Sequence, residues 1–210
     1  MMLCCLMSCS VVFAMNITQV KNLGEPSDKY NYPHGYIQYV RDEQGNQLCF
    51  KRSGNGNYPS TQIVKLISRD GRFDYLSFPY TYRMHITEIR TSNPTKVFWL
   101  LEGSIGESGG YTTGMWLIGN NQGKYVTYVS LDGIQNAGMP TETQLLFEYN
   151  NDGTIKINGR KDGFFPDKVG HQYWIIGSVK LFWDEDAQWF GISNFVSEPN
   201  IRMDGKGGLS

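Results

Sequence analysis

The sequence has no excess of charge of either sign and no long run of like charges. It contains 19 Lys and Arg residues against 20 Asp and Glu residues, which gives a net charge of -1 at pH 7. Affinity for nucleic acid depends largely on Lys and Arg side chains that neutralise phosphates and release counterions. We therefore expect no nucleic-acid partner for this chain.

The sequence also lacks the motifs that mark common catalytic and cofactor sites. It has no Gly-x-Ser-x-Gly elbow, no Walker loop and no dinucleotide fingerprint. The three histidines, His34, His85 and His171, have none of the spacings of a zinc site, which needs three or four grouped ligands. The glycine-rich stretch 103–114 lies between expected strands, so it lacks the helix N-terminus that binds phosphate. We expect no metal and no cofactor, and these absences favour a noncatalytic protein.

Cysteine is rare outside the first fourteen residues. Residues 1–14 (MMLCCLMSCSVVFA) contain no charged residue and hold three of the four cysteines. A short apolar segment that ends in Val-x-Ala before polar sequence is typical of a secretory signal peptide, so we expect cleavage after Ala14 and export to the periplasm or the medium. The mature chain then keeps Cys49 alone, which cannot form an internal disulfide.

Three other interpretations of residues 1–14 stay open. They could form a buried first strand or helix of the domain. A membrane anchor is disfavoured, because fourteen helical residues span about 21 Å against a hydrocarbon core of roughly 30 Å. Leu6-Met7-Ser8-Cys9 resembles a bacterial lipobox, but the chain stays apolar through Phe13 instead of turning polar after Cys9. We favour a cleaved leader over lipidation at Cys9, and we expect no transmembrane span in the mature chain.

Five pairs of strand-like segments, each pair separated by a short turn with Gly, Asn, Asp or Glu, predict β-hairpins. The pairs are 36–41 with 47–52, 63–68 with 72–78, 115–118 with 124–131, 145–149 with 154–158, and 179–183 with 188–195. No window of a dozen residues keeps the 3.6-residue period of a helix. We expect an all-β fold: one antiparallel, hairpin-rich domain built as a sandwich or a barrel, with an incomplete propeller as a further possibility.

The hairpins place this β domain at 34–197. Residues 15–33 are expected to form an irregular N-terminal segment, because 22–33 is largely polar. Residues 198–210 are expected to form a loose C-terminal tail, since it is polar and glycine-rich after Met203.

Alternation along the strands predicts which faces are buried. In 80–89 the apolar face includes Met84 and Ile86, and the polar face includes His85 and Thr87, which we expect to be solvated. The runs 96–101 and 173–176 are continuously apolar or nearly so, as is typical of central strands covered on both faces.

Aromatic side chains are the best candidates for a binding site. Aromatic rings stack on sugar rings while polar neighbours fix the orientation of the ligand. The candidate ligand-binding residues are Tyr32, Tyr36, Tyr80, Tyr82, Trp183 and Trp189. Because sheets favour aromatic residues in any case, core packing is the competing interpretation at each position.

The sequence thus favours an exported, noncatalytic β domain that acts by surface recognition at the cell envelope, with an unknown protein or a glycan as its partner. The first alternative is a carbohydrate-binding module. The second is a hydrolase that uses paired carboxylates, for which Glu102 and Glu107 are the candidates, because glycoside hydrolysis needs two carboxyl groups about 5 to 9.5 Å apart.

For these two carboxyl groups we expect a solvated position at the mouth of a hairpin loop. Their pKa values should then stay near the ordinary value of about 4.3. Substitution of either residue by Gln should shift stability by less than about 0.5 kcal/mol.

Overall fold

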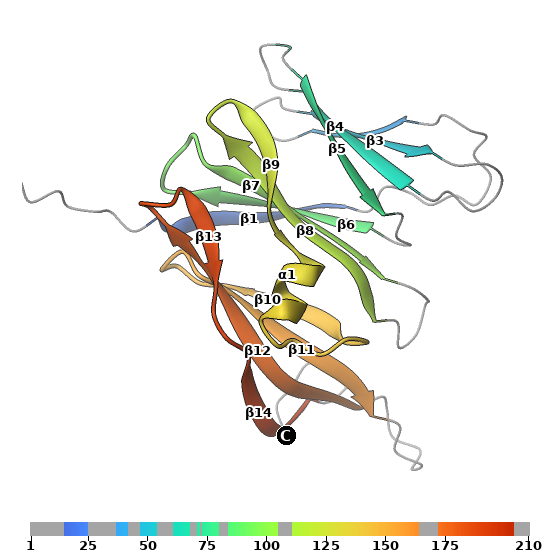
Figure 1. The fold of residues 1–210 in the computed structure, drawn as a ribbon, viewed down its shortest axis with the longest axis vertical. Helices are drawn as coiled ribbons and strands as arrows, with labels where there is room; N and C mark the ends of the chain where they lie inside the picture. The colour runs from blue at the N-terminus through green and yellow to red at the C-terminus, as the bar shows by residue number, and fades with distance from the viewer. Residues whose placement is uncertain are drawn as a thin grey trace, which may run out of the picture.

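The described part of the chain is built almost entirely from β-strands. The structure is a computed structural model that describes residues 15–24, 37–41, 47–53, 61–67, 71, 73–79, 84–104, 111–163 and 172–203. Within these ranges fourteen strands and one short helix form three sheets, and all strand pairs are antiparallel (Figure 1). The expected all-β fold class is confirmed, and none of the sheets closes into a barrel over the described strands.

The central sheet has the strand order β1-β6-β7-β8-β9. Its strands are β1 (Ile17–Gly24), β6 (Met84–Thr91), β7 (Val97–Ser104), β8 (Thr112–Asn121) and β9 (Lys124–Ser130). β7 lies in the middle, and residues 97–101 are all buried. The prediction that this apolar run forms a central strand covered on both faces is therefore confirmed.

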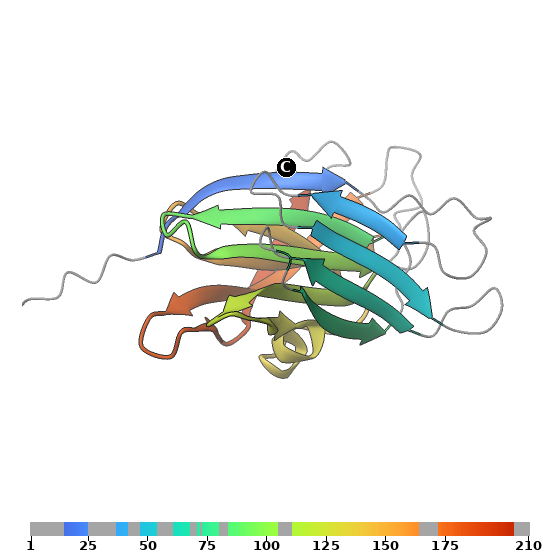
Figure 2. The same ribbon diagram turned by 90° about the horizontal axis from the view of Figure 1, so that it is seen from above.

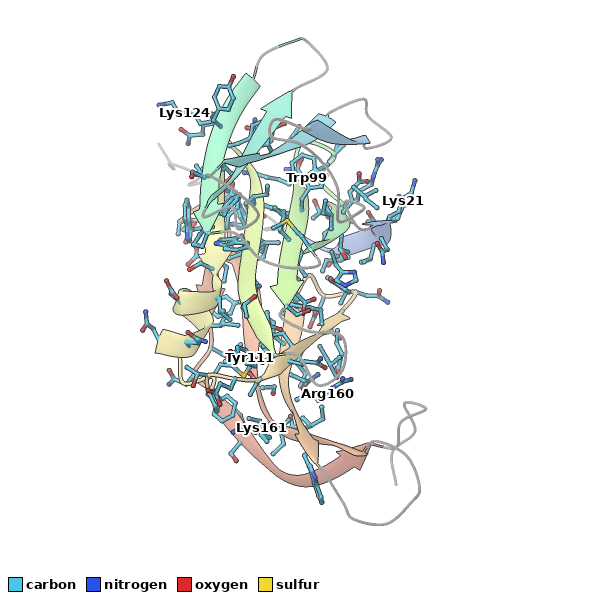
Figure 3. The ribbon with its side chains drawn as sticks, turned by 90° about the vertical axis from the view of Figure 1, so that its right-hand side faces the viewer. Lys21, Trp99, Tyr111, Lys124, Arg160 and Lys161 are labelled. Carbon is cyan, nitrogen blue, oxygen red and sulfur yellow. The ribbon has the colours of Figure 1, made fainter. Side chains whose placement is uncertain are left out.

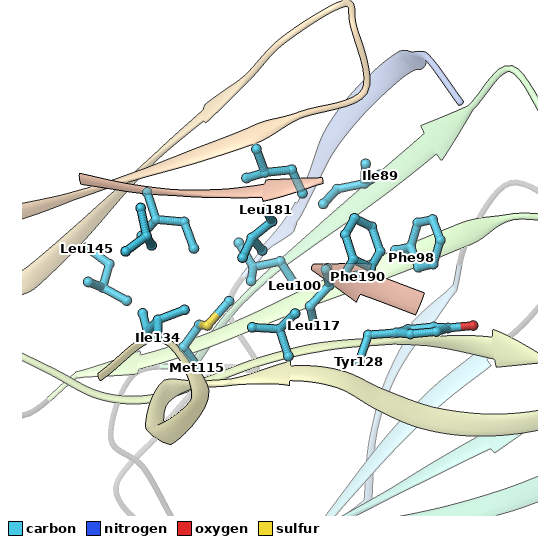
Figure 4. Packing of buried hydrophobic residues seen from close by; sticks show 14 of the residues in the cluster. Ile89, Phe98, Leu100, Met115, Leu117, Tyr128, Ile134, Leu145, Leu181 and Phe190 are labelled. Atoms are coloured by element: carbon cyan, nitrogen blue, oxygen red, sulfur yellow. The ribbon is translucent and has the colours of Figure 1, made fainter. Parts of the chain in front are cut away.

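A second sheet, the C-terminal sheet, covers one face of the central sheet. Its strands are β10 (Gln144–Tyr149), β11 (Ile155–Gly163), β12 (Gln172–Asp184), β13 (Trp189–Ile192) and β14 (Val196–Met203). β13 and β14 both pair with β12, along different parts of its length. Figure 4 shows the apolar core between the two sheets, in which Phe98, Leu100 and Leu117 meet Leu145 and Leu181.

The third sheet, the N-terminal sheet, lies on the opposite face of the central sheet (Figure 1) and overlies it in the view from above (Figure 2). It contains β2 (Ile37–Arg41), β3 (Gln47–Ser53), β4 (Thr61–Ile67) and β5 (Phe73–Pro79) in that order. Leu66 and Phe78 pack there against Trp99 and Trp116 of the central sheet. The architecture is therefore a sandwich of three layers, and the central layer is apolar on both faces.

All five predicted hairpins are present. The β8–β9 turn is formed by Gln122 and Gly123, whose φ values of 51° and 90° match the left-handed residues of a tight hairpin turn. The strand expected at 124–131 ends at Ser130, whose hydroxyl accepts the N–H of Gly133 and begins helix α1 (Leu131–Asn136).

Two segments expected to lack regular structure form strands instead. Within 15–33, Ile17–Gly24 is β1 and pairs with β6. The expected tail of 198–210 overlaps β14, Val196–Met203, which pairs with β12. Both are strands whose pairing depends on backbone hydrogen bonds, which polar side chains do not prevent. The strand expected over 188–195 is shorter than predicted: β13 covers Trp189–Ile192.

Candidate functional site

Of the six candidate ligand-binding residues, the structure describes Trp183 and Trp189. Tyr32, Tyr36, Tyr80 and Tyr82 lie outside the described residues. Trp183 is on β12 and Trp189 on β13, and the register of this hairpin pairs Trp183 with Phe190 and Trp189 with Asp184. The two tryptophans are therefore close along the hairpin but belong to different cross-strand pairs.

Trp183 packs within an aromatic cluster between the central and C-terminal sheets. The centroid of its ring lies 5.6 Å from that of Phe98, 5.6 Å from that of Tyr128 and 5.2 Å from that of Phe190. Its indole nitrogen is buried and has no hydrogen-bond partner among the described residues. These contacts favour core packing, the competing interpretation, for this residue.

Trp189 is exposed over 38% of its surface, and Phe182 on the neighbouring strand is exposed over 43%. Phe182 pairs with Gly191 and Trp189 with Asp184, so the two rings start from the same face of the β12–β13 hairpin. We call Phe182 and Trp189 the aromatic face.

Both rings of the aromatic face are held in place. The ring of Trp189 is supported by Tyr128, with 4.7 Å between the centroids. The ring of Phe182 lies so close over Gly191 that a Cβ atom there would come within 2.4 Å of it. Sequence reasoning missed Phe182, although a ring opposite a glycine in a predicted hairpin was a usable signal.

Polar groups border the aromatic face at the β12–β13 turn. Asp184 Oδ1 accepts the N–H groups of Asp186 and Ala187 at 3.0 and 2.9 Å. The amide of Gln188 donates to Glu185 Oε2 at 2.9 Å. The turn is therefore fixed by its own hydrogen bonds, and it presents carboxylate and amide groups beside the rings.

Lys96 approaches the same end of the sandwich from the central sheet. Its ammonium group lies 4.8 Å from the centroid of the Trp183 ring, a cation–π distance. Burial lowers the pKa of Lys96, and the negative charge of Glu185 opposes that shift.

Glu102, expected in a solvated loop, lies within β7 instead. Every second residue of a strand lies on the same face. Glu102 therefore shares a face with Phe98 and Leu100, and this face meets the C-terminal sheet. Burial raises its pKa to about 7, although a hydrogen bond from Thr112 and the positive charge of Arg160 favour ionisation. The expectation of an ordinary pKa was wrong, because another sheet covers this end of β7. Glu107 lies outside the described residues.

Thr112 joins Glu102 to the C-terminal sheet. Its hydroxyl donates to Glu102 Oε1 at 3.2 Å and accepts the backbone N–H of Leu145 at 3.0 Å. Its own N–H donates to the carbonyl of Thr143 at 2.8 Å. The first residue of β8 therefore holds the start of β10 against the central sheet. Figure 3 labels Tyr111, which directly precedes β8, and Arg160 of β11, both in the lower half of the view.

Three more polar residues surround Glu102. Tyr149 on β10 interacts with the Thr87 side chain across the two sheets, and its pKa is raised by burial and by the negative charge of Glu102. His85 is half-buried and lies opposite Glu102 in the register of β6 and β7. The face of β6 expected to be solvated therefore points toward the C-terminal sheet. We call this group the Glu102 cluster; it contains His85, Thr87, Glu102, Thr112, Tyr149 and Arg160.

No family model, no curated protein and no solved structure matches the chain.

Neither region of interest has the composition of a metal site. The described residues contain no group of three or more His, Cys, Asp and Glu side chains that could hold a metal ion. No helix in the described part of the chain is long and apolar enough to cross a membrane. The aromatic face has the means to stack on a flat apolar ligand surface, and the Glu102 cluster has the means to exchange a proton near neutral pH.

Proposed function

We propose that this chain is an exported, noncatalytic recognition domain of the cell envelope, and that the aromatic face binds a saccharide chain. The observation that carries the proposal is the exposure of Trp189 and Phe182, whose positions share one face of the β12–β13 hairpin in the strand register. Sugar rings present apolar C–H faces that pack on aromatic rings, and their hydroxyls bond to polar neighbours.

The support beneath the aromatic face favours a preorganised site. Tyr128 lies against Trp189, and the Tyr128 hydroxyl is itself bonded to the carbonyl of Asn120 at 3.0 Å. Rings that are held before binding lose little conformational freedom when a ligand arrives, which favours affinity.

The charge beside the rings narrows the ligand class. Asp184, Glu185 and Asp186 lie in the turn that borders the aromatic face. Carboxylates repel anionic groups and accept hydrogen bonds from hydroxyls, so the preferred ligand is a neutral or amino saccharide rather than an acidic one.

Binding is tested with the mature chain against an array of neutral, amino and acidic oligosaccharides, followed by titration of tryptophan fluorescence. We expect neutral or amino sugars to change the emission, and Trp189→Ala to abolish binding while the protein stays folded. Tyr75→Ala is the matched control, because Tyr75 is 56% exposed but lies on the N-terminal sheet. Silence across the array, with binding to a protein partner instead, would reject the saccharide proposal.

A paired-carboxylate hydrolase is the second candidate, and the raised pKa of Glu102 is the observation that favours it. A carboxyl group that titrates near neutral pH suits a general acid. However, the groups that act on the pKa of Glu102 are Thr112 and Arg160, and no described carboxylate is among them. Release of a chromophore from aryl glycosides by the wild-type protein, lost in Glu102→Gln, would establish the hydrolase.

A further inference from the structure

We propose that protonation of Glu102 controls how firmly the start of β10 is held on the central sheet. This inference concerns the Glu102 cluster and does not depend on saccharide binding at the aromatic face.

The connection runs through one hydroxyl group. Thr112 donates to Glu102 Oε1 and accepts from the N–H of Leu145, so the carboxyl group of the central sheet and the backbone of β10 share the same partner. A change in the charge of Glu102 therefore acts directly on the residue that joins the two sheets.

The surroundings of Glu102 compensate an anion poorly. Leu100 precedes it on the same face, and Met115 lies opposite it on β8. Among the described residues, the Thr112 hydroxyl is the group that donates a hydrogen bond to this carboxyl, and a single neutral donor replaces little of the hydration that an ionised carboxylate loses on burial.

Charged and titratable groups face Glu102 from the neighbouring strands. Arg160 on β11 contributes a positive charge, Tyr149 on β10 is a phenol that stays neutral in this range, and His85 on β6 lies opposite Glu102 in register. The positive charge of Arg160 offsets burial only in part, because the balance leaves the pKa of Glu102 raised.

We call the arrangement in which Thr112 is bonded to both Glu102 and Leu145 closed. The neutral carboxyl group of Glu102 stabilises this closed arrangement, and the ionised carboxylate favours an open arrangement that water can enter. Ionisation should increase the population in which Thr112 and the start of β10 have separated. The strand and its neighbours can stay folded, since the change is a local opening.

The test is amide hydrogen exchange at Leu145 and Thr112 in the full mature chain, expressed as protection factors so that the intrinsic effect of pH is removed. We expect protection to fall about tenfold between pH 6 and pH 8 in the wild-type protein, as linkage predicts for a carboxyl group that titrates near 7 when closed and near 4.5 when open. Glu102→Gln should show no such fall.

Two controls and one direct measurement keep the result interpretable. Glu142→Gln changes an exposed carboxyl three residues before Leu145 and should behave as wild type. His85→Asn should keep the pH dependence, and its loss there would assign the effect to His85 and overturn the proposal. A carboxyl carbon NMR titration of wild-type Glu102 needs no variant: a midpoint near neutral supports the proposal, and a midpoint below 5 overturns it.

Discussion

The hydroxyl of Thr112 accepts the backbone N–H of Leu145 at 3.0 Å, across 33 residues of chain. This bond joins the central sheet to the C-terminal sheet beside the half-buried Glu102. It makes Thr112 the residue on which the stability of this end of the sandwich should depend most.

Thr112→Val should lower the free energy of unfolding by about 2 kcal/mol, because a buried N–H and a half-buried carboxyl group both lose their partner. Urea denaturation at pH 6 measures the loss. Thr127→Val, a half-buried position on β9, is the control and should change stability by less than about 1 kcal/mol. Equal effects of the two substitutions would contradict the role assigned to Thr112.

Stability should fall as pH rises through neutrality. Glu102 has a pKa of about 7 in the folded chain and 4.5 as its ordinary value, so the folded state binds more protons between these two pH values. The stabilisation is fully present below pH 4.5 and is lost as pH rises through 7. The shift corresponds to at most about 3 kcal/mol.

The difference in unfolding free energy between wild type and Glu102→Gln, measured from pH 5 to pH 9, isolates this contribution from other titrating groups. We expect the variant to gain stability relative to wild type as pH rises. If the free energy of unfolding changes with pH in the same way in both proteins, ionisation of Glu102 does not destabilise the folded chain. This expectation replaces the one drawn from the sequence, in which Glu102→Gln had almost no effect.

The two tryptophans of the β12–β13 hairpin should differ in their effect on stability. Trp183→Ala removes a ring packed against Phe98, Tyr128 and Phe190, and it should cost about 3–5 kcal/mol. Trp189→Ala removes a more exposed ring and should cost about 1 kcal/mol. Thermal and urea denaturation of both variants would check this order, and a larger loss for Trp189 would contradict it.

Gly153 allows the β10–β11 hairpin to approach the start of β1. Its φ is +84°, and a Cβ atom there would lie 1.8 Å from the carbonyl oxygen of Met15. Gly153→Ala should therefore destabilise the chain by more than about 2 kcal/mol. Gly123→Ala is a matched control, since its φ is +90° with no atom within 4 Å of the added Cβ, and it should cost only about 1 kcal/mol.

Export should remove residues 1–14. The side chain of Met15 joins the core between the central and C-terminal sheets, so a cut after Ala14 leaves every described residue in place. N-terminal sequencing of protein from the periplasm or the medium should start at or near Met15. An intact Met1 on cytoplasmic protein would reject export.

Local turn chemistry explains which parts of the fold could be predicted. Gly123, Gly153 and their polar neighbours mark hairpins within a few residues of sequence, and those hairpins were predicted correctly. β1 and β14 were missed because other strands separate them in sequence from their partners, β6 and β12, and because both carry polar side chains.

The candidate site was predicted less well for the same reason. Alternation showed that Thr87 and His85 share a face, but it could not show that another sheet covers that face. The burial of Glu102 depends on β10 and β11, which follow it by more than forty residues. Trp189 was found from its residue type alone, and the contacts that favour core packing at Trp183 come from β7 and β9.

The indole N–H signals of the five tryptophans test saccharide binding at the aromatic face most directly. They are recorded by NMR on the labelled mature chain while an oligosaccharide that scores in the array is added, with each signal assigned by substitution. The Trp189 signal should shift in proportion to occupancy, while that of Trp99, buried against the N-terminal sheet, should stay fixed. Binding that leaves the Trp189 signal unmoved would place the ligand elsewhere and contradict the proposed site.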